Sequence, residues 1–281
     1  MTIGIAAYSA PDNLIVVASD MMISTGNMSA DVTGIKSRAI ARHWLALFAG
    51  NDISCVVPIL KEVNEILRPI PDTLENVGKA FVDALQTQLR LKNENEILRP
   101  LGYTLERFQE VGLHQLGSEQ FSRLLFRIES QTLDVEFLVA GFDADVAQIF
   151  TVRPPGTISN YTPLGFWAIG SGQTNALGSL FNSGAVVFAD TASTMYRVCE
   201  AKFNSESAIG IGKKTVLTLL RKDMSRWSAP FMFIDALRPL WEKTRVLTVP
   251  AEAHAKTEEL WATAKKQWEQ ENDENKSLTP D

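Results

Sequence analysis

The chain has 281 residues, of which 45% are hydrophobic and 21% charged, values that exclude a disordered protein and fit one substantial core with an appendage. Its formal net charge of −6 and pI near 5.3 give no electrostatic basis for binding a nucleic-acid backbone. No apolar run approaches the roughly 20 residues that span a bilayer, and no basic segment followed by an apolar stretch opens the chain, so we expect a cytoplasmic protein without a membrane partner.

The first predicted strands begin at the N-terminus. Residues 2–8 and 14–20 form two apolar runs rich in β-branched residues, and the turn-forming residues 9–13 separate them. This pattern predicts a β-hairpin that starts at the second residue. Because a chain end normally frays unless something fixes it, such a start points to a role for the first residues.

Enzymes that use an N-terminal side chain as nucleophile need a fixed first residue. The hydroxyl of Thr2 becomes a nucleophile only if a base takes its proton, and a free α-amine, with a pKa of about 7.7–8.0, can be that base. A nearby cation would lower that pKa further, and Lys36 is the candidate. Asp20, at the end of the second run, is the candidate carboxylate that a buried lysine requires.

The order of these residues resembles proteasome β-subunits and their bacterial relatives, including the heat-shock peptidase rings and the Anbu-type homologues. In that family a catalytic N-terminal Thr starts a strand, an Asp ends the returning strand, a Lys follows, and a later Gly gives its backbone N–H to the oxyanion. Thr2, Asp20, Lys36 and Gly50 match this order, and the spacings from Asp to Lys and from Lys to Gly agree. The hairpin is two residues longer than usual, an even insertion that keeps inward residues facing inward.

The next predicted elements are a pair of short strands and two helices. Residues 35–40 and 43–48 form the strands, which end at Ala49-Gly50. Apolar residues at helical spacing predict a helix over 51–67, with Asn51 or Asp52 as its cap and prolines after its end. A second helix is expected over 74–91.

The stretch 93–130 mixes apolar residues with glycines at no steady period. We predict a packed loop with short helices, which is an insertion relative to the resembled family. The alternative is a lid over the functional site.

Regular patterning returns with a predicted strand pair at 133–141 and 147–152, followed by a strand that ends in Gly170-Ser171-Gly172. Alone, Gly-Ser-Gly is a common turn between a strand and a helix. In the resembled family a Gly-Ser-Gly at this place puts a Ser near the N-terminal amine, so the resemblance implies that Ser171 belongs to the site. Helices at 173–183 and about 190–205 and a strand at 215–220 complete this part.

The connection before the last strand matches the family only loosely. The family often carries an Asp, a Ser three residues later and then a Gly, which together support the active Thr. Glu206 and Gly210 match, whereas Ile209 stands at the position of the Ser. Residues 210–215 do not form a phosphate-binding loop, because the Gly, Lys and Ser/Thr spacing of that motif is absent.

Cysteines and histidines give no pattern of a metal site or a cofactor site. Cys55 and Cys199 lie in predicted helices without a CxxC spacing, so we expect buried, reduced thiols. His43, His114 and His254 lack metal-ligand spacing and receive no role. No cofactor is expected.

The segment 225–281 lies outside the resemblance. It contains a predicted helix over about 251–271, in which Trp261 and Trp268 share a face because they are seven residues apart. That face packs on the chain's own core or, as the alternative, docks on a neighbouring subunit. The polar residues 272–281 are expected to be loose.

These elements predict an α+β protein, and the resemblance implies the four-layer αββα sandwich of N-terminal nucleophile hydrolases. We expect this domain over 1–224, with the insertion at 93–130, and a C-terminal helical extension over 225–281. The implied function is a threonine-type peptidase that cleaves peptides or proteins as a homo-oligomeric ring or helical assembly, with Thr2 exposed by Met1 removal. An unfoldase partner is neither indicated nor excluded.

Two other functions stay open at this stage. The chain could be a non-catalytic structural or assembly subunit, which Ile209 in place of the supporting Ser favours. It could also be an amidase for a small metabolite, because N-terminal nucleophile folds serve several amide substrates.

Overall fold

The computed structural model describes residues 2–25, 28–31, 36–184, 186–223 and 226–244. The chain divides into two compact units, Met1–Arg238 and Pro239–Asp281, and the helix α6 (Phe231–Thr244) crosses the division. The two five-stranded sheets and the candidate site belong to the first unit. The domain boundary expected between 224 and 225 stays a prediction, and the helix predicted over 251–271, with its tryptophans and His254, lies outside the described residues.

The first five-stranded sheet contains the N-terminal hairpin, and its neighbouring strands are antiparallel. Its order is β10 (Phe166–Gly170), β1 (Ile3–Ser9), β2 (Leu14–Asp20), β11 (Thr215–Arg221) and β12 (Arg226–Ser228). Asn13 ends the hairpin turn with a φ of 48°, a conformation that Asn tolerates better than most residues. The predicted hairpin is confirmed.

The second five-stranded sheet is also antiparallel. Its order is β5 (Ser37–Ile40), β6 (Trp44–Gly50), β7 (Val135–Asp143), β8 (Val146–Arg153) and β9 (Thr157–Asn160). A separate hairpin is formed by β3 (Met22–Thr25) and β4 (Met28–Asp31). The sequence did not predict β3, β4, β9 or β12, because runs of three or four residues are too short to show an alternating pattern.

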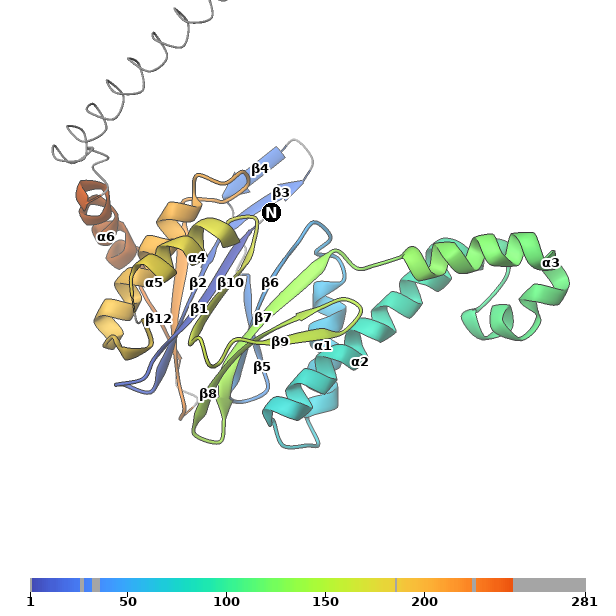
Figure 1. The fold of residues 1–281 in the computed structure, drawn as a ribbon, viewed down its shortest axis with the longest axis horizontal. Coiled ribbons are helices and arrows are strands. Elements are labelled where there is room, and N and C mark those ends of the chain that lie inside the picture. The colour runs from blue at the N-terminus through green and yellow to red at the C-terminus, as the bar shows by residue number, and fades with distance from the viewer. Residues whose placement is uncertain (1, 26–27, 32–35, 185, 224–225, 245–281) are drawn as a thin grey trace, which may run out of the picture. The chain divides into compact units, whose positions relative to one another are not determined.

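The two five-stranded sheets form the middle layers of a four-layer sandwich (Figure 1). Between the sheets lies an apolar core that includes Ile15 and Val17 from one sheet and Leu47 and Leu138 from the other. The helices α4 (Gln173–Asn182) and α5 (Thr191–Ser205) cover the first sheet, together with the short helix η3 (Val186–Phe188). The helices α1 (Val56–Leu67) and α2 (Leu74–Asn93) cover the second. The predicted α+β, αββα class is confirmed.

The predicted cap of α1 was wrong. Its first turn follows Cys55, which makes no capping side-chain hydrogen bond. The Asp52 carboxylate instead accepts hydrogen bonds from the backbone and hydroxyl of Ser54, and the Asn51 amide donates to Asp134 at 2.7 Å. Because both candidate caps are used locally before the helix begins, the helix starts four residues later than Asp52.

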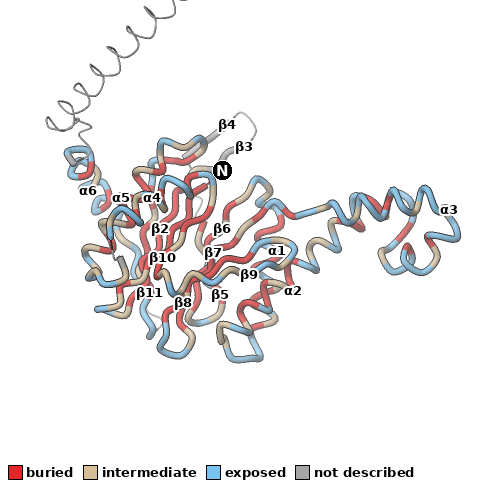
Figure 2. The backbone as a smooth tube through the Cα atoms, in the orientation of Figure 1, coloured by how far each residue is buried: buried red, intermediate tan, exposed pale blue. Residues whose placement is uncertain are grey.

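The prediction of a packed loop with short helices at 93–130 was wrong in its loop and right in its short helices. α2 continues through η1 (Glu94–Leu98) and η2 (Arg99–Leu101), and α3 (Leu105–Ser130) follows as two helical stretches joined by a kink at Gly117, whose φ is 77°. A small apolar cluster holds the segment together; it includes Ile97, Leu98, Tyr103, Phe108 and Leu124. Figure 2 shows that buried residues concentrate in the two sheets, whereas most of α3 is exposed. An exposed helix lacks the apolar period that sequence reasoning needs.

None of the helices in the described part of the chain combines the length and the apolar character that crossing a bilayer would require.

Candidate active site

The carboxylate of Asp20 lies at the centre of the site. Asp20 ends β2 and is fully buried. One of its oxygens accepts hydrogen bonds from the Thr2 hydroxyl at 2.9 Å and from the Ile3 backbone N–H at 3.0 Å. The other accepts backbone N–H groups of Met22 at 3.1 Å and Gly212 at 3.3 Å. The carboxylate is therefore held from both sides and cannot rotate without losing several bonds.

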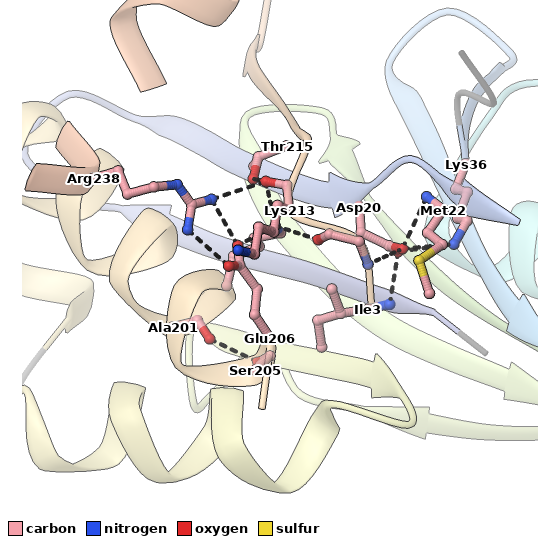
Figure 3. Close-up of polar contacts among 12 residues, drawn as sticks. Ile3, Asp20, Met22, Lys36, Ala201, Ser205, Glu206, Lys213, Thr215 and Arg238 are labelled. Carbon is pink, nitrogen blue, oxygen red and sulfur yellow. Dashed lines mark hydrogen bonds and ion pairs between the residues drawn. The ribbon is translucent and has the colours of Figure 1, made fainter. Parts of the chain in front are cut away.

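Lys36 supplies the cation next to this carboxylate. Its ammonium donates to the two Asp20 oxygens (Figure 3), at 2.9 and 3.0 Å. The Lys36 side chain is 8% exposed. Removing one partner of an ion pair this deeply buried strongly destabilises the fold, because the other charge is left without compensation. The two residues that the sequence proposed as a pair thus form one.

The register of the hairpin brings Thr2 to Asp20. Gly4 pairs with Ser19 across β1 and β2, so the residues just before Gly4 lie beside the end of β2. Thr2 is buried, and Gly170 of β10 lies against its carbonyl with a φ of 96°. A Cβ at Gly170 would stand 2.2 Å from the Thr2 oxygen, so the close approach requires glycine.

Ser171 follows Gly170 and also reaches Thr2. Its hydroxyl lies 3.4 Å from the Thr2 carbonyl oxygen and 3.3 Å from the carbonyl oxygen of Ile209, and it can donate to either. The structure therefore places Ser171 beside the carbonyl of Thr2, and the expected proximity of Ser171 to the Thr2 amine stays a prediction.

Thr2 and Gly50 line the same cavity, which has a volume of about 450 Å³. Gly50 has a φ of 154°, and a Cβ there would lie 2.1 Å from the Asp134 carbonyl oxygen. Ser171 and Arg153 also line the cavity, and none of the described lining residues comes from 93–130, so the lid alternative gains no support. Cavities of about 660 and 830 Å³ lie elsewhere, but neither contains Thr2 or Gly50, so volume alone does not identify the site.

Glu206, which the sequence predicted to support Thr2, lies among other charged side chains. Its carboxylate accepts hydrogen bonds from the Lys202 ammonium and from the Arg238 guanidinium, the latter at 2.7 and 2.8 Å. The described hydrogen bonds of Glu206 thus join it to α5 and α6. They do not give Thr2 the direct support that the sequence predicted. Lys202 and Glu206 are four residues apart on a helix, so their side chains lie on the same face and can pair.

Sequence reasoning found the Gly170-Ser171-Gly172 turn but assigned a site role only to its Ser, although glycines allow close backbone approach. It missed Lys202 and Gly212. For Lys202 the sequence held a signal, because Lys202 lies four residues before Glu206 on a helix. For Gly212 it held no signal, since the contact of Gly212 with Asp20 spans 192 residues of sequence.

The cysteines do not contribute a nucleophile to this site. Cys55 and Cys199 are buried and unpaired, as predicted. Burial raises the pKa of both thiols, that of Cys199 to about 12, so both are protonated near neutral pH. Among the described residues, no group of three or more His, Cys, Asp or Glu side chains could hold a metal ion.

Comparison with known proteins finds a likeness in structure alone. No family model matches the sequence, and no curated protein matches it. A solved structure of an Anbu (Gly-1) mutant from Hyphomicrobium sp. strain MC1 superposes with a TM-score of 0.60 at 12% sequence identity, over 89% of this chain and 100% of that one. The chain therefore has the fold of this Anbu protein.

Proposed function

We propose that this chain is a threonine-type peptidase or amide hydrolase of the proteasome β-subunit type, with Thr2 as nucleophile after Met1 is removed. One observation carries the proposal. The buried Asp20 carboxylate binds both the Thr2 hydroxyl and the Lys36 ammonium, at 2.9 Å each, and Thr2 itself lines a cavity.

The proposed reaction starts with attack of the Thr2 Oγ on a substrate carbonyl carbon. The hydroxyl proton passes to the α-amine of Thr2 and then to the leaving amine as the C–N bond breaks. An ester between Thr2 and the acyl group results, and water, activated by the same amine, hydrolyses it. No cofactor takes part in this sequence.

The surrounding residues have separate proposed roles. The positive charge of Lys36 favours the neutral form of the nearby amine, and Asp20 compensates that charge in the buried site. The backbone N–H of Gly50 stabilises the oxyanion, a contribution of about 10²–10³ in rate where single donors have been removed. The hydroxyl of Ser171 relays a proton or holds the attacking water. Glu206 acts indirectly, because its carboxylate binds Lys202 and Arg238.

A non-catalytic assembly subunit is the second candidate. Ile209 favours it, because the family's supporting hydroxyl is missing there and the Ile209 side chain is 81% exposed. In that case Asp20 and Lys36 would serve only the stability of the hairpin. The two functions differ in whether Thr2 reacts.

The proposal includes assembly of several copies into a ring or an open helical array that acts on peptides or proteins. The proteasome-like fold supports this, and light scattering on the purified chain would measure the mass of the assembly. The cytoplasmic location expected from the sequence stays a prediction.

Hydrolysis of fluorogenic peptides by the purified protein tests the proposal. The wild-type chain should release the fluorophore, Thr2→Ala should not, and Thr2→Ser should retain part of the activity because it keeps a hydroxyl nucleophile. Equal rates for wild type and Thr2→Ala would show that Thr2 is not the nucleophile and would favour the assembly subunit.

A further inference from the structure

A cluster of charged side chains at the end of α5 lies behind the active site. Lys202 is fully buried, and its ammonium donates to Glu206 and to the backbone carbonyls of Gly212 and Lys213 at 2.7 and 2.9 Å. Arg238 donates to both oxygens of Glu206 and to the Lys213 carbonyl at 2.9 Å (Figure 3). We call these three side chains, Lys202, Glu206 and Arg238, the α5 cluster.

The α5 cluster fixes the backbone that follows the helix. An ammonium group has three N–H donors, and here a carboxylate and two carbonyls accept them. Burial lowers the pKa of Lys202, and the Glu206 carboxylate opposes that shift. Since a buried charge is costly unless its hydrogen bonds are satisfied, the bonds to both carbonyls tie residues 212 and 213 to α5.

The same stretch of backbone makes two contacts with the active site. The carbonyl of Gly212 accepts from Lys202, while its N–H donates to Asp20 at 3.3 Å. The carbonyl of Ile209 lies 3.3 Å from the Ser171 hydroxyl. The segment therefore reaches the site through backbone atoms, with the Ile209 side chain turned to solvent.

We propose that Lys202 is a positioning residue for catalysis: through the carbonyls of 212 and 213 it fixes the segment whose backbone orients Asp20 and Ser171. The hydrogen bonds of Lys202 replace the support that the resembled family obtains from a hydroxyl at the position of Ile209. Lys202 touches neither Thr2 nor the cavity and acts through Gly212. The inference rests on the proposed peptidase function.

Lys202→Met tests the inference, because Met keeps the length of the side chain without its donors. The matched control is Lys79→Met, which removes another lysine that pairs with a carboxylate four residues later, Asp83, but on the exposed surface of α2. For both variants, thermal unfolding, kcat, KM and hydrogen–deuterium exchange of residues 207–214 are measured on the full chain.

We expect Lys202→Met to lower kcat by about 10- to 100-fold, the size of effect that small misplacements of catalytic groups produce. KM should stay nearly unchanged, because the cavity is intact, and exchange should rise in 207–214 but not in the β1–β2 hairpin. Lys79→Met should change none of these. A folded Lys202→Met with wild-type kcat and wild-type exchange in 207–214 would overturn the inference.

Arg238→Met tests the positioning role of the α5 cluster if Lys202→Met does not fold. This side chain is 21% exposed, so its loss is better tolerated, and it should raise exchange in 207–214 and lower kcat by less than the loss of Lys202. Unchanged exchange and kcat in Arg238→Met would overturn the inference. A wild-type chain without activity would instead refute the proposed function itself, before any variant is compared, and the inference would fall with it.

Discussion

The site is built from two regions that hold their residues by different means. Thr2, Asp20 and Gly50 lie on or beside strands of the two sheets, and backbone pairing fixes them. The segment 206–213 follows α5 and is held by the α5 cluster. The two regions meet at Asp20, whose carboxylate accepts from both Thr2 and Gly212.

The difference shows which part of an active site a sequence can reveal. Pairing between strands has a period of two, so the positions of Thr2 and Asp20 follow from the lengths of the hairpin runs and its turn. The α5 cluster depends on side chains that meet only when helices and strands have packed. We therefore expect the strand-borne region to carry the chemistry and the α5 region to tune it.

The largest effect is expected at Thr2. If the strand-borne region carries the chemistry, Thr2→Ala should reduce kcat/KM by a factor on the order of 10⁴ or more, as loss of a nucleophile does in other hydrolases. Circular dichroism should show an unchanged fold. Residual hydrolysis above a few per cent of wild type would mean that another group attacks the substrate.

The ion pair of Asp20 and Lys36 should dominate the stability of the strand-borne region. Asp20→Asn leaves a buried ammonium without a charged partner, so the free energy of unfolding should fall by roughly 3–5 kcal/mol. Lys36→Met should have a similar effect, and the double variant Asp20→Asn/Lys36→Met should cost less than the sum of the two. Denaturant unfolding measures all three, and strict additivity would show that the two charges do not depend on each other.

Gly50 provides a test of backbone geometry in the same region. Gly50→Ala places a Cβ 2.1 Å from a backbone oxygen at a φ of 154°, so the free energy of unfolding should fall by at least about 2 kcal/mol. Gly178→Ala is the control, because that glycine is an exposed helical residue of α4 with nothing within 4 Å of the added Cβ. The control should gain up to about 1 kcal/mol. A neutral Gly50→Ala would refute the close approach to Asp134.

An effect confined to alkaline pH, and absent near neutral pH, is expected in α5. The folded-state pKa of Cys199 is raised from 9.0 to about 12, so the stability that the protonated thiol contributes is complete below pH 9 and is lost as pH rises toward 12. Between these values, Cys199→Ala should show a shallower decline of the free energy of unfolding, by up to about 1.4 kcal/mol per pH unit. Equal slopes for the two proteins would show that the thiol titrates normally.

Much of the fold and part of the site could be predicted from the sequence. The β1–β2 hairpin and the β7–β8 pair were visible in their apolar runs, and Thr2, Asp20 and Lys36 in their spacing. The extent of α3 was underestimated, as a loop with short helices, because its surface is mostly exposed and glycines interrupt its apolar pattern. Glu206 was assigned to the support of Thr2 from its loose match to an Asp of the resembled family. Its partner Arg238 lies 32 residues further along the chain, where no local pattern could reveal the pairing.

The most direct test of the central claim is the intact mass of the purified protein before and after incubation with an epoxyketone directed at N-terminal threonine. The account predicts a mass without Met1 and one covalent adduct, which is absent in Thr2→Ala and present in Lys79→Met. A protein that retains Met1 and forms no adduct would contradict the account and assign the chain to the assembly subunit.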